Sequence, residues 1–133
     1  MTPELSALVA AAILGFAHII LASHAMSLQR GYRWSASARD EPMPPVTGVA
    51  DRLARASGNF GETFAFFAAG VFLVHVTGSA TVATAWAAWI YVGARVAYLI
   101  AYASGVFLVR SLIWNVATLA TIALLLAPLV PYW

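Results

Sequence analysis

Residues 52–67 read RLARASGNFGETFAFF, and this stretch is the one that decides the fold. Its polar residues Arg55, Asn59 and Glu62 recur at i, i+4 and i+7, so an α-helix places them in one stripe. The same helix continues as AFFAAGVFLVHV, which is apolar enough to enter a membrane. A charged stripe is costly inside a bilayer. We therefore expect side chains of the neighbouring helices to provide partners for this polar stripe.

The composition is that of an integral membrane protein. The chain has 133 residues, of which 62% are apolar and 9% are charged, whereas a soluble domain has about 25% charged residues. The mean hydropathy is +0.85. The absence of cysteine excludes a disulfide framework, a thiolate nucleophile and a cysteine-based metal site. A net charge of +2 without any lysine gives no indication of nucleic-acid binding.

Four apolar segments use up the whole length, which predicts a single all-α domain with four membrane spans. The first segment is long enough to cross a hydrocarbon core of about 30 Å. Because MTPELSALVA has no basic residue, we interpret that segment as a retained span and not as a signal peptide. Pro128 and Pro131 close the last span, and Tyr132 and Trp133 are expected at a membrane interface. The expected spans are residues 5–28, 52–76, 82–103 and 107–130.

The long polar connection, residues 30–50, reads RGYRWSASARDEPMPPVTGVA, and its prolines and Gly48 are expected to prevent a helix. Nine of the twelve charges and five of the seven arginines lie between Arg30 and Glu62. The positive-inside rule therefore predicts a cytoplasmic loop, with both chain ends on the other side. For a bacterial protein this is a multi-pass topology in the inner membrane.

The first span contains two histidines, His18 and His24. They are six residues apart and do not share a helical face, so a metal site formed by the two is not expected. The prediction for His18 is a neutral ring that is hydrogen-bonded to a carbonyl or to a neighbouring helix.

Span three carries a second polar stripe, with Arg95, Tyr98 and Tyr102 at i, i+3 and i+7. Span four opens with Arg110 and Ser111. The predicted topology places these side chains and those of span two in the cytoplasmic half of the bilayer. Pairing Glu62 with Arg95 or Arg55 would offset part of the cost, yet a surplus of positive charge would remain, and such a surplus favours an anionic ligand. The alternative is a polar network that only fixes helix packing.

Two segments, PPVTGVADRLARASGNFGETFAFFAA and ARVAYLIAYASGVFLVRSLIW, resemble the MAPEG family, the membrane-associated proteins in eicosanoid and glutathione metabolism. The resemblance rests on Arg-x3-Asn-x2-Glu in one span, then Arg, Tyr and Tyr in the next, then Arg-Ser at the start of the last. It covers spans two and three and the start of span four in detail, and all four spans in layout. The overall character is that of the small bacterial members.

The resemblance implies a four-helix bundle that assembles as a homotrimer and binds glutathione between subunits. It implies that Arg110 activates the glutathione thiolate and that Ser111 assists. The apolar co-substrate, a lipophilic small molecule, would enter from the lipid bilayer. The residues that the resemblance assigns to glutathione binding are Arg30, Arg55, Asn59, Glu62, Arg95, Tyr98 and Tyr102; Arg30 matches only loosely.

Three positions depart from the family pattern. Gly58 stands where some relatives have a basic residue, Tyr98 stands where prostaglandin E synthase-like members have His, and Trp114 replaces a Tyr of several relatives. These departures bear on activity and not on fold.

Three functions follow from the same residues. The first is a glutathione-dependent transferase or peroxidase that acts on lipophilic electrophiles. The second is a non-enzymatic membrane protein that binds an anion or a lipid headgroup in the same pocket. The third is a small exporter in which Glu62 exchanges protons for a cationic drug, and the nearby arginines argue against it.

Overall fold

The computed structural model describes residues 1–130, and over this range the chain is helical and contains no strand. A short helix α2, Tyr32–Ser35, and a 3-10 turn, Ala127–Leu129, accompany four long helices. All four long helices are long and apolar enough to cross a membrane. The prediction of an all-α membrane bundle is therefore confirmed, while Pro131, Tyr132 and Trp133 lie outside the described residues. The long helices are α1 (Pro3–Arg30), α3 (Gly48–Val76), α4 (Val82–Ser104) and α5 (Phe107–Leu126).

Local sequence chemistry sets the ends of these helices. The Thr2 side chain accepts a hydrogen bond from the Leu5 amide at the start of α1, and Thr81 forms a capping box with Thr84 at the start of α4. Gly105 ends α4 with φ +80°, a left-handed conformation that glycine adopts without steric cost. The tight turn between α4 and α5 thus follows from the Ser-Gly pair in the sequence.

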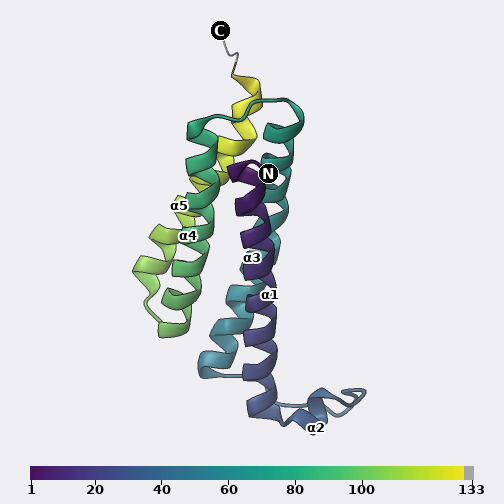
Figure 1. The fold of residues 1–133 in the computed structure, drawn as a ribbon. Coiled ribbons are helices and arrows are strands. Elements are labelled where there is room, and N and C mark those ends of the chain that lie inside the picture. Colours follow the sequence, from purple (N-terminus) through teal and green to yellow (C-terminus); the bar gives the residue numbers. More distant parts are fainter. Residues whose placement is uncertain (131–133) are drawn as a thin grey trace.

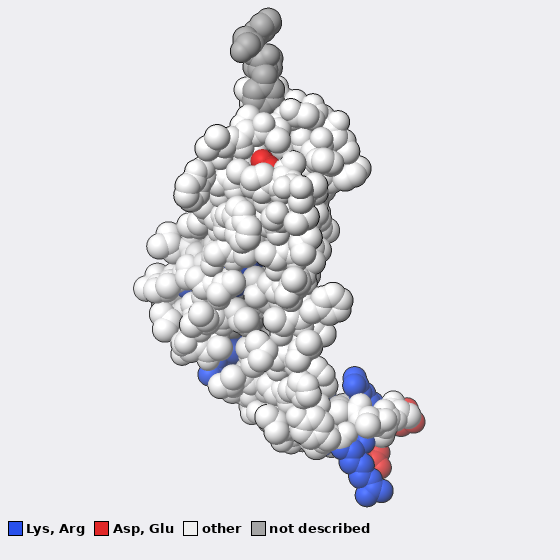
Figure 2. All heavy atoms as spheres, in the orientation of Figure 1, with Lys and Arg blue, Asp and Glu red and all other residues white. Residues whose placement is uncertain are grey.

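The helices run side by side along one axis (Figure 1). Helix α1 packs on α3, and α4 packs on α5, while α3 also contacts α5. Helix α1 begins toward the end of the bundle where the 3-10 turn Ala127–Leu129 lies, and α2 with its loop lies at the other end (Figure 1). Figure 2 shows a mostly uncharged face, with a few basic atoms partway along the bundle, between the charged loop end and an acidic group near the opposite end. This distribution is what a membrane-embedded bundle requires.

Small residues allow the helices to approach closely. A Cβ on Gly70 would lie 3.0 Å from Leu124 Cβ, so α3 and α5 are in contact there. A Cβ on Gly15 would lie 2.9 Å from the Phe60 ring, which marks the crossing of α1 and α3. Phe67 and Tyr91 stack with ring centroids 3.8 Å apart in the middle of the bundle.

The connection between α1 and α3 differs from the expectation. It was expected to contain no helix, but residues Tyr32–Ser35 form α2, which is held against α1 by a Ser27–Ser35 hydrogen bond of 2.9 Å. Gly48 does not interrupt a helix, because it is the first residue of α3. The Gln29 side chain exchanges two hydrogen bonds with the Thr47 backbone, at 2.8 and 3.0 Å, and so closes the loop at its base.

Candidate functional site

A polar cavity of about 260 Å³ lies among α3, α4 and α5. Helix α3 contributes Asn59 to it and α4 contributes two tyrosines one turn apart, because the polar stripes predicted from the sequence face each other here. The first turns of α5 supply the remaining residues. The cavity is lined by Asn59, Tyr98, Tyr102, Arg110, Ser111, Trp114 and Asn115.

Tyr102 connects two of the arginines. The Arg110 guanidinium carbon lies 4.7 Å from the centre of the Tyr102 ring, and that of Arg55 lies 5.8 Å from the same ring. The Tyr98 ring meets Tyr102 edge-on, with centroids 5.3 Å apart. Arg110 is thereby held at the cavity wall without a carboxylate partner among the described residues.

Arg95 lies behind the cavity and not in its wall. Its side chain is 1% exposed, and its Nη1 donates a 3.1 Å hydrogen bond to Asn59 Oδ1. The guanidinium also sits over the Tyr98 ring at 4.9 Å. Within the described chain, Nε and Nη2 have no hydrogen-bond partner. Arg95 therefore supports two residues that line the cavity.

The hydrogen bond expected for His18 is not formed within the described residues, so that part of the expectation is wrong. Its ring is 1% exposed and packs on Phe60 with centroids 4.7 Å apart, and neither ring nitrogen has a hydrogen-bond partner among residues 1–130. The Tyr91 hydroxyl is likewise buried and has no hydrogen-bond partner among the described residues. A residue pattern on one helix gave no signal that His18 would face Phe60 and the side of the bundle that holds Arg95.

Besides Arg95, three predicted site residues do not line the cavity. Glu62 is exposed on α3, and Arg55 forms its ion pair with Asp51, at 2.9 Å, and not with Glu62. Arg30 is the last residue of α1, and its side chain contacts the loop: its Nη2 donates to the Pro44 carbonyl at 3.0 Å, and its guanidinium carbon lies 4.9 Å from the centre of the Trp34 ring. Neither Arg30 nor Glu62 lines the cavity that holds Arg110.

Two contributing residues were not identified as site residues from the sequence. Arg52 Nε donates to the Ala103 carbonyl at 3.1 Å, which ties the start of α3 to the end of α4. Asn115 donates its side-chain amide to the Ser111 carbonyl at 2.9 Å, so its own carbonyl oxygen remains as an acceptor toward the cavity. The sequence does place Asn115 one helical turn after Ser111, and this spacing could have identified Asn115 as a site residue.

The cavity suits an anion. Its donors are a guanidinium, two phenol hydroxyls and the Asn59 amide, and no carboxylate lines it among the described residues. Trp114 also borders a second, apolar cavity of about 310 Å³, which is lined by side chains of α3 and α5. The described residues hold no cluster of His, Cys, Asp or Glu that fits a metal. A cavity rich in hydrogen-bond donors and an apolar cavity therefore adjoin at Trp114.

A comparison with known protein families matches the sequence to the MAPEG family over residues 7–130. A search of curated proteins finds no significant match. The family match covers all four spans, and the polar stripes of α3 and α4 that suggested the family meet at the cavity. The chain is therefore an integral, multi-pass membrane protein that belongs to the MAPEG family, whose members act in glutathione and eicosanoid metabolism.

Proposed function

We propose that the protein is a membrane-embedded, glutathione-dependent transferase or peroxidase that acts on lipophilic electrophiles. The observation that supports this most is the cavity beside Arg110, which offers several donors and no carboxylate among the described residues. Glutathione carries two carboxylates and one thiol, so it needs such donors. The family match independently favours glutathione as the co-substrate.

Arg110 is the proposed activating residue. A thiol of the cysteine type has a pKa of about 8.5, so only a few per cent is thiolate at neutral pH. A guanidinium near the sulfur stabilises the anion and lowers the pKa of the bound thiol. Ser111, the neighbouring residue in the cavity wall, is proposed to assist, with a hydroxyl suited to donate to the same sulfur.

Once the thiolate is formed, the reaction needs little more than the correct placement of the thiolate and its reaction partner. In conjugation, the thiolate sulfur forms a bond to an electrophilic carbon, and the leaving group departs with the displaced electron pair. In peroxide reduction, the thiolate attacks one oxygen, the O–O bond breaks, and the alkoxide takes a proton to give an alcohol. A second glutathione then converts the sulfenic acid to glutathione disulfide and water. The apolar cavity beside Trp114 is proposed to hold the lipophilic partner.

The remaining residues have proposed supporting roles. Asn59, Tyr98 and Tyr102 would bind polar groups of glutathione directly, and Arg95 would act through Asn59 and Tyr98. Arg55, Glu62 and Arg30 would contribute from outside this cavity, in the way that the family resemblance implies for an assembled homotrimer. The same proposal places the protein in a bacterial inner membrane with its loop in the cytoplasm.

The test is the ultraviolet absorbance of the glutathione thiolate, titrated against pH with purified protein at saturating glutathione. The expected apparent pKa lies below about 8.5 for the wild type and returns toward that value in Arg110→Ala. The rate of conjugation with a chloro-dinitrobenzene should fall by roughly a hundredfold in this variant. Arg33→Gln, which alters an exposed loop arginine, is the control and should leave both quantities unchanged.

Two results would contradict the proposal. A wild-type protein that binds glutathione without any thiolate signal is not an activating enzyme. Binding with no turnover of any electrophile would instead favour the anion-binding alternative. Cation binding that is lost in Glu62→Gln would favour the exporter, although Glu62 lies outside the described cavity.

A further inference from the structure

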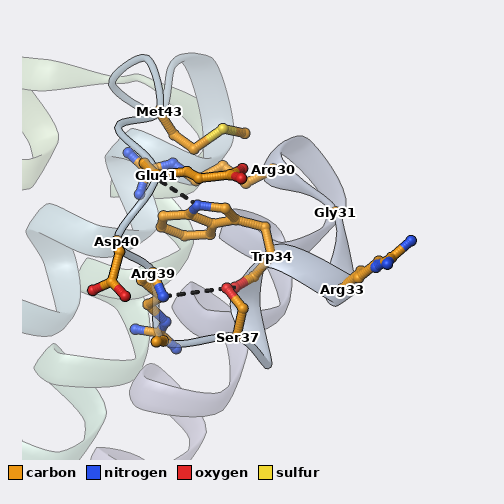
Figure 3. A pocket seen from close by; sticks show the side chains of 10 residues that line it. Arg30, Gly31, Arg33, Trp34, Ser37, Arg39, Asp40, Glu41 and Met43 are labelled. Carbon is orange, nitrogen blue, oxygen red and sulfur yellow. Dashed lines mark hydrogen bonds between the residues drawn. The ribbon is translucent and has the colours of Figure 1, made fainter.

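A second polar cavity, of about 640 Å³, lies in the connection between α1 and α3. Figure 3 shows Arg39, Glu41 and Met43 near the indole of Trp34, with Arg33 extending away from it. Unlike the cavity beside Arg110, it combines both signs of charge. Its charged lining residues are Arg30, Arg33, Arg39, Asp40 and Glu41.

The loop forms an ordered frame around the indole. The guanidinium carbons of Arg30 and Arg39 lie 4.9 and 5.8 Å from the centre of the Trp34 ring. Trp34 Nε1 donates to the Glu41 carbonyl at 3.1 Å, which folds the chain back over the ring. Arg39 has φ +62°, a conformation that costs energy in a residue with a side chain, and two hydrogen bonds from its guanidinium to the Ser35 carbonyl hold it there.

Hydrogen-bonding capacity remains unused in this frame. Arg30 Nε is buried without a partner among the described residues. Arg33 is exposed, and Figure 3 shows it extending away from the indole toward open space. The ion pair that the described residues form, Arg55–Asp51, lies outside the loop, so Asp40 and Glu41 do not neutralise these arginines by ion pairing within that range. Separated, unpaired charges of both signs suit a ligand that carries both signs itself.

The position of the cavity favours a lipid over a soluble ligand. It begins where the apolar helix α1 ends, at Arg30, and Leu28 is 75% exposed just before it. Tyr32 and Trp34 are aromatic residues of the kind that sit at headgroup level. A headgroup in the cavity would therefore leave its acyl chains beside the exposed apolar face of α1.

We propose that this loop cavity binds the headgroup of a phospholipid that carries a phosphate and a primary ammonium, such as phosphatidylethanolamine. The guanidinium groups would bind the phosphate, and Asp40 and Glu41 would accept hydrogen bonds from the ammonium. A choline headgroup has no N–H to donate, and a glycerol headgroup has no cation, so both lack half of this recognition. The site is separate from the cavity beside Arg110 and does not depend on glutathione chemistry.

The experiment is native mass spectrometry of the delipidated full-length protein with equimolar phosphatidylethanolamine, phosphatidylcholine and phosphatidylglycerol. We expect the ethanolamine lipid to be retained roughly tenfold more than either competitor, the effect of a charge-assisted hydrogen bond. Arg33→Gln should lower retention of the ethanolamine and glycerol lipids together. The double variant Asp40→Asn/Glu41→Gln should remove the preference for ethanolamine while retaining phosphatidylglycerol.

Controls separate this site from its alternatives. Asp51→Asn, an acid-to-amide change outside the cavity, should keep the lipid preference, and thermal melting confirms that each variant is folded. Equal retention of all three lipids, or an unchanged preference in Asp40→Asn/Glu41→Gln, would overturn the proposal. Glycerophosphoethanolamine that binds as tightly as the lipid would overturn the assignment to a membrane ligand, and displacement of the lipid by glutathione would reassign the cavity.

Discussion

Two arginines of the same polar layer have opposite surroundings. Arg110 lines a cavity and stands against an aromatic ring, so it can meet a ligand directly. Arg95 is buried, and its described hydrogen bond goes to Asn59. A buried guanidinium with unpartnered donors contributes little to stability, since the desolvation cost offsets its contacts. Arg95 is therefore better explained as support for Asn59 and Tyr98 than as a structural ion.

Arg95→Met tests this assignment. We expect glutathione affinity to fall by about tenfold, because Asn59 loses the donor that orients its amide. The thermal midpoint should stay the same or rise, because an apolar side chain of similar length removes the buried charge. Calorimetric titration and thermal unfolding in detergent measure the two quantities. A lower midpoint with unchanged affinity would show that Arg95 is purely structural.

At the scale of helices, a buried polar contact joins α1 to α4 near the chain ends. The Glu4 side chain is 2% exposed, and its Oε1 accepts a 2.6 Å hydrogen bond from Thr84 Oγ1. Its Oε2 has no partner within residues 1–130. A carboxylate in this position depends on the single donor that it has.

Thr84→Val should therefore destabilise the bundle by about 1–3 kcal/mol, since it leaves a buried carboxylate without its hydrogen bond and also removes the Thr84 half of the capping box with Thr81. Thr118→Val is the matched control. The Thr118 hydroxyl bonds the Trp114 carbonyl of its own helix, at 2.9 Å, so its loss should cost much less. Denaturant unfolding of both variants gives the comparison, and equal losses would contradict a specific role for the Glu4–Thr84 contact.

The packing of α3 against α5 is testable with two glycines. Gly70→Ala places a Cβ 3.0 Å from Leu124 Cβ and 3.5 Å from α5 backbone atoms, so it should cost about 1–3 kcal/mol by overpacking. Gly93→Ala meets nothing within 4 Å and should be neutral or stabilise by up to about 1 kcal/mol. Melting temperatures that shift equally for both variants would argue against this contact.

Sequence periodicity predicted the helices well, because membrane spans leave long apolar runs and the turn between α4 and α5 contains a glycine. It also predicted which faces of α3 and α4 are polar, and Asn59, Tyr98 and Tyr102 do meet at one cavity. It did not separate Arg95 from that cavity. A polar stripe shows which side of its own helix a residue faces. It does not show whether that side chain lines a cavity between helices or lies behind the cavity wall.

The ion pairing on α3 and the structure of the loop around Trp34 could not be predicted from the sequence, for different physical reasons. Glu62 had several nearby arginines as candidate partners, and the ion pair that forms on α3 is Arg55–Asp51, an i, i+4 contact within the helix. The folded loop around Trp34 depends on side chain to backbone hydrogen bonds that have no periodic signature. Such hydrogen bonds can be identified only when the path of the loop backbone is known.

For the whole molecule, the loop cavity and the cavity beside Arg110 lie toward the end of the bundle that holds the α1–α3 connection and the α4–α5 turn (Figure 1). The family match and the four spans establish a membrane protein of the MAPEG family. We propose glutathione chemistry for the cavity beside Arg110 and a lipid contact for the loop cavity. Apart from Arg30, to which both proposals give a role, the two cavities have separate charged residues, so a variant of another charged residue in one should leave the other intact.

The most direct measurement is an experimental structure of the protein with bound glutathione. We predict density for glutathione in the cavity of Asn59, Tyr102 and Arg110, with the sulfur within hydrogen-bond reach of the Arg110 guanidinium and the carboxylates near the donors of Asn59, Tyr98 and Tyr102. Glutathione found only at the loop around Trp34, or a cavity that stays empty at saturating glutathione, would contradict it.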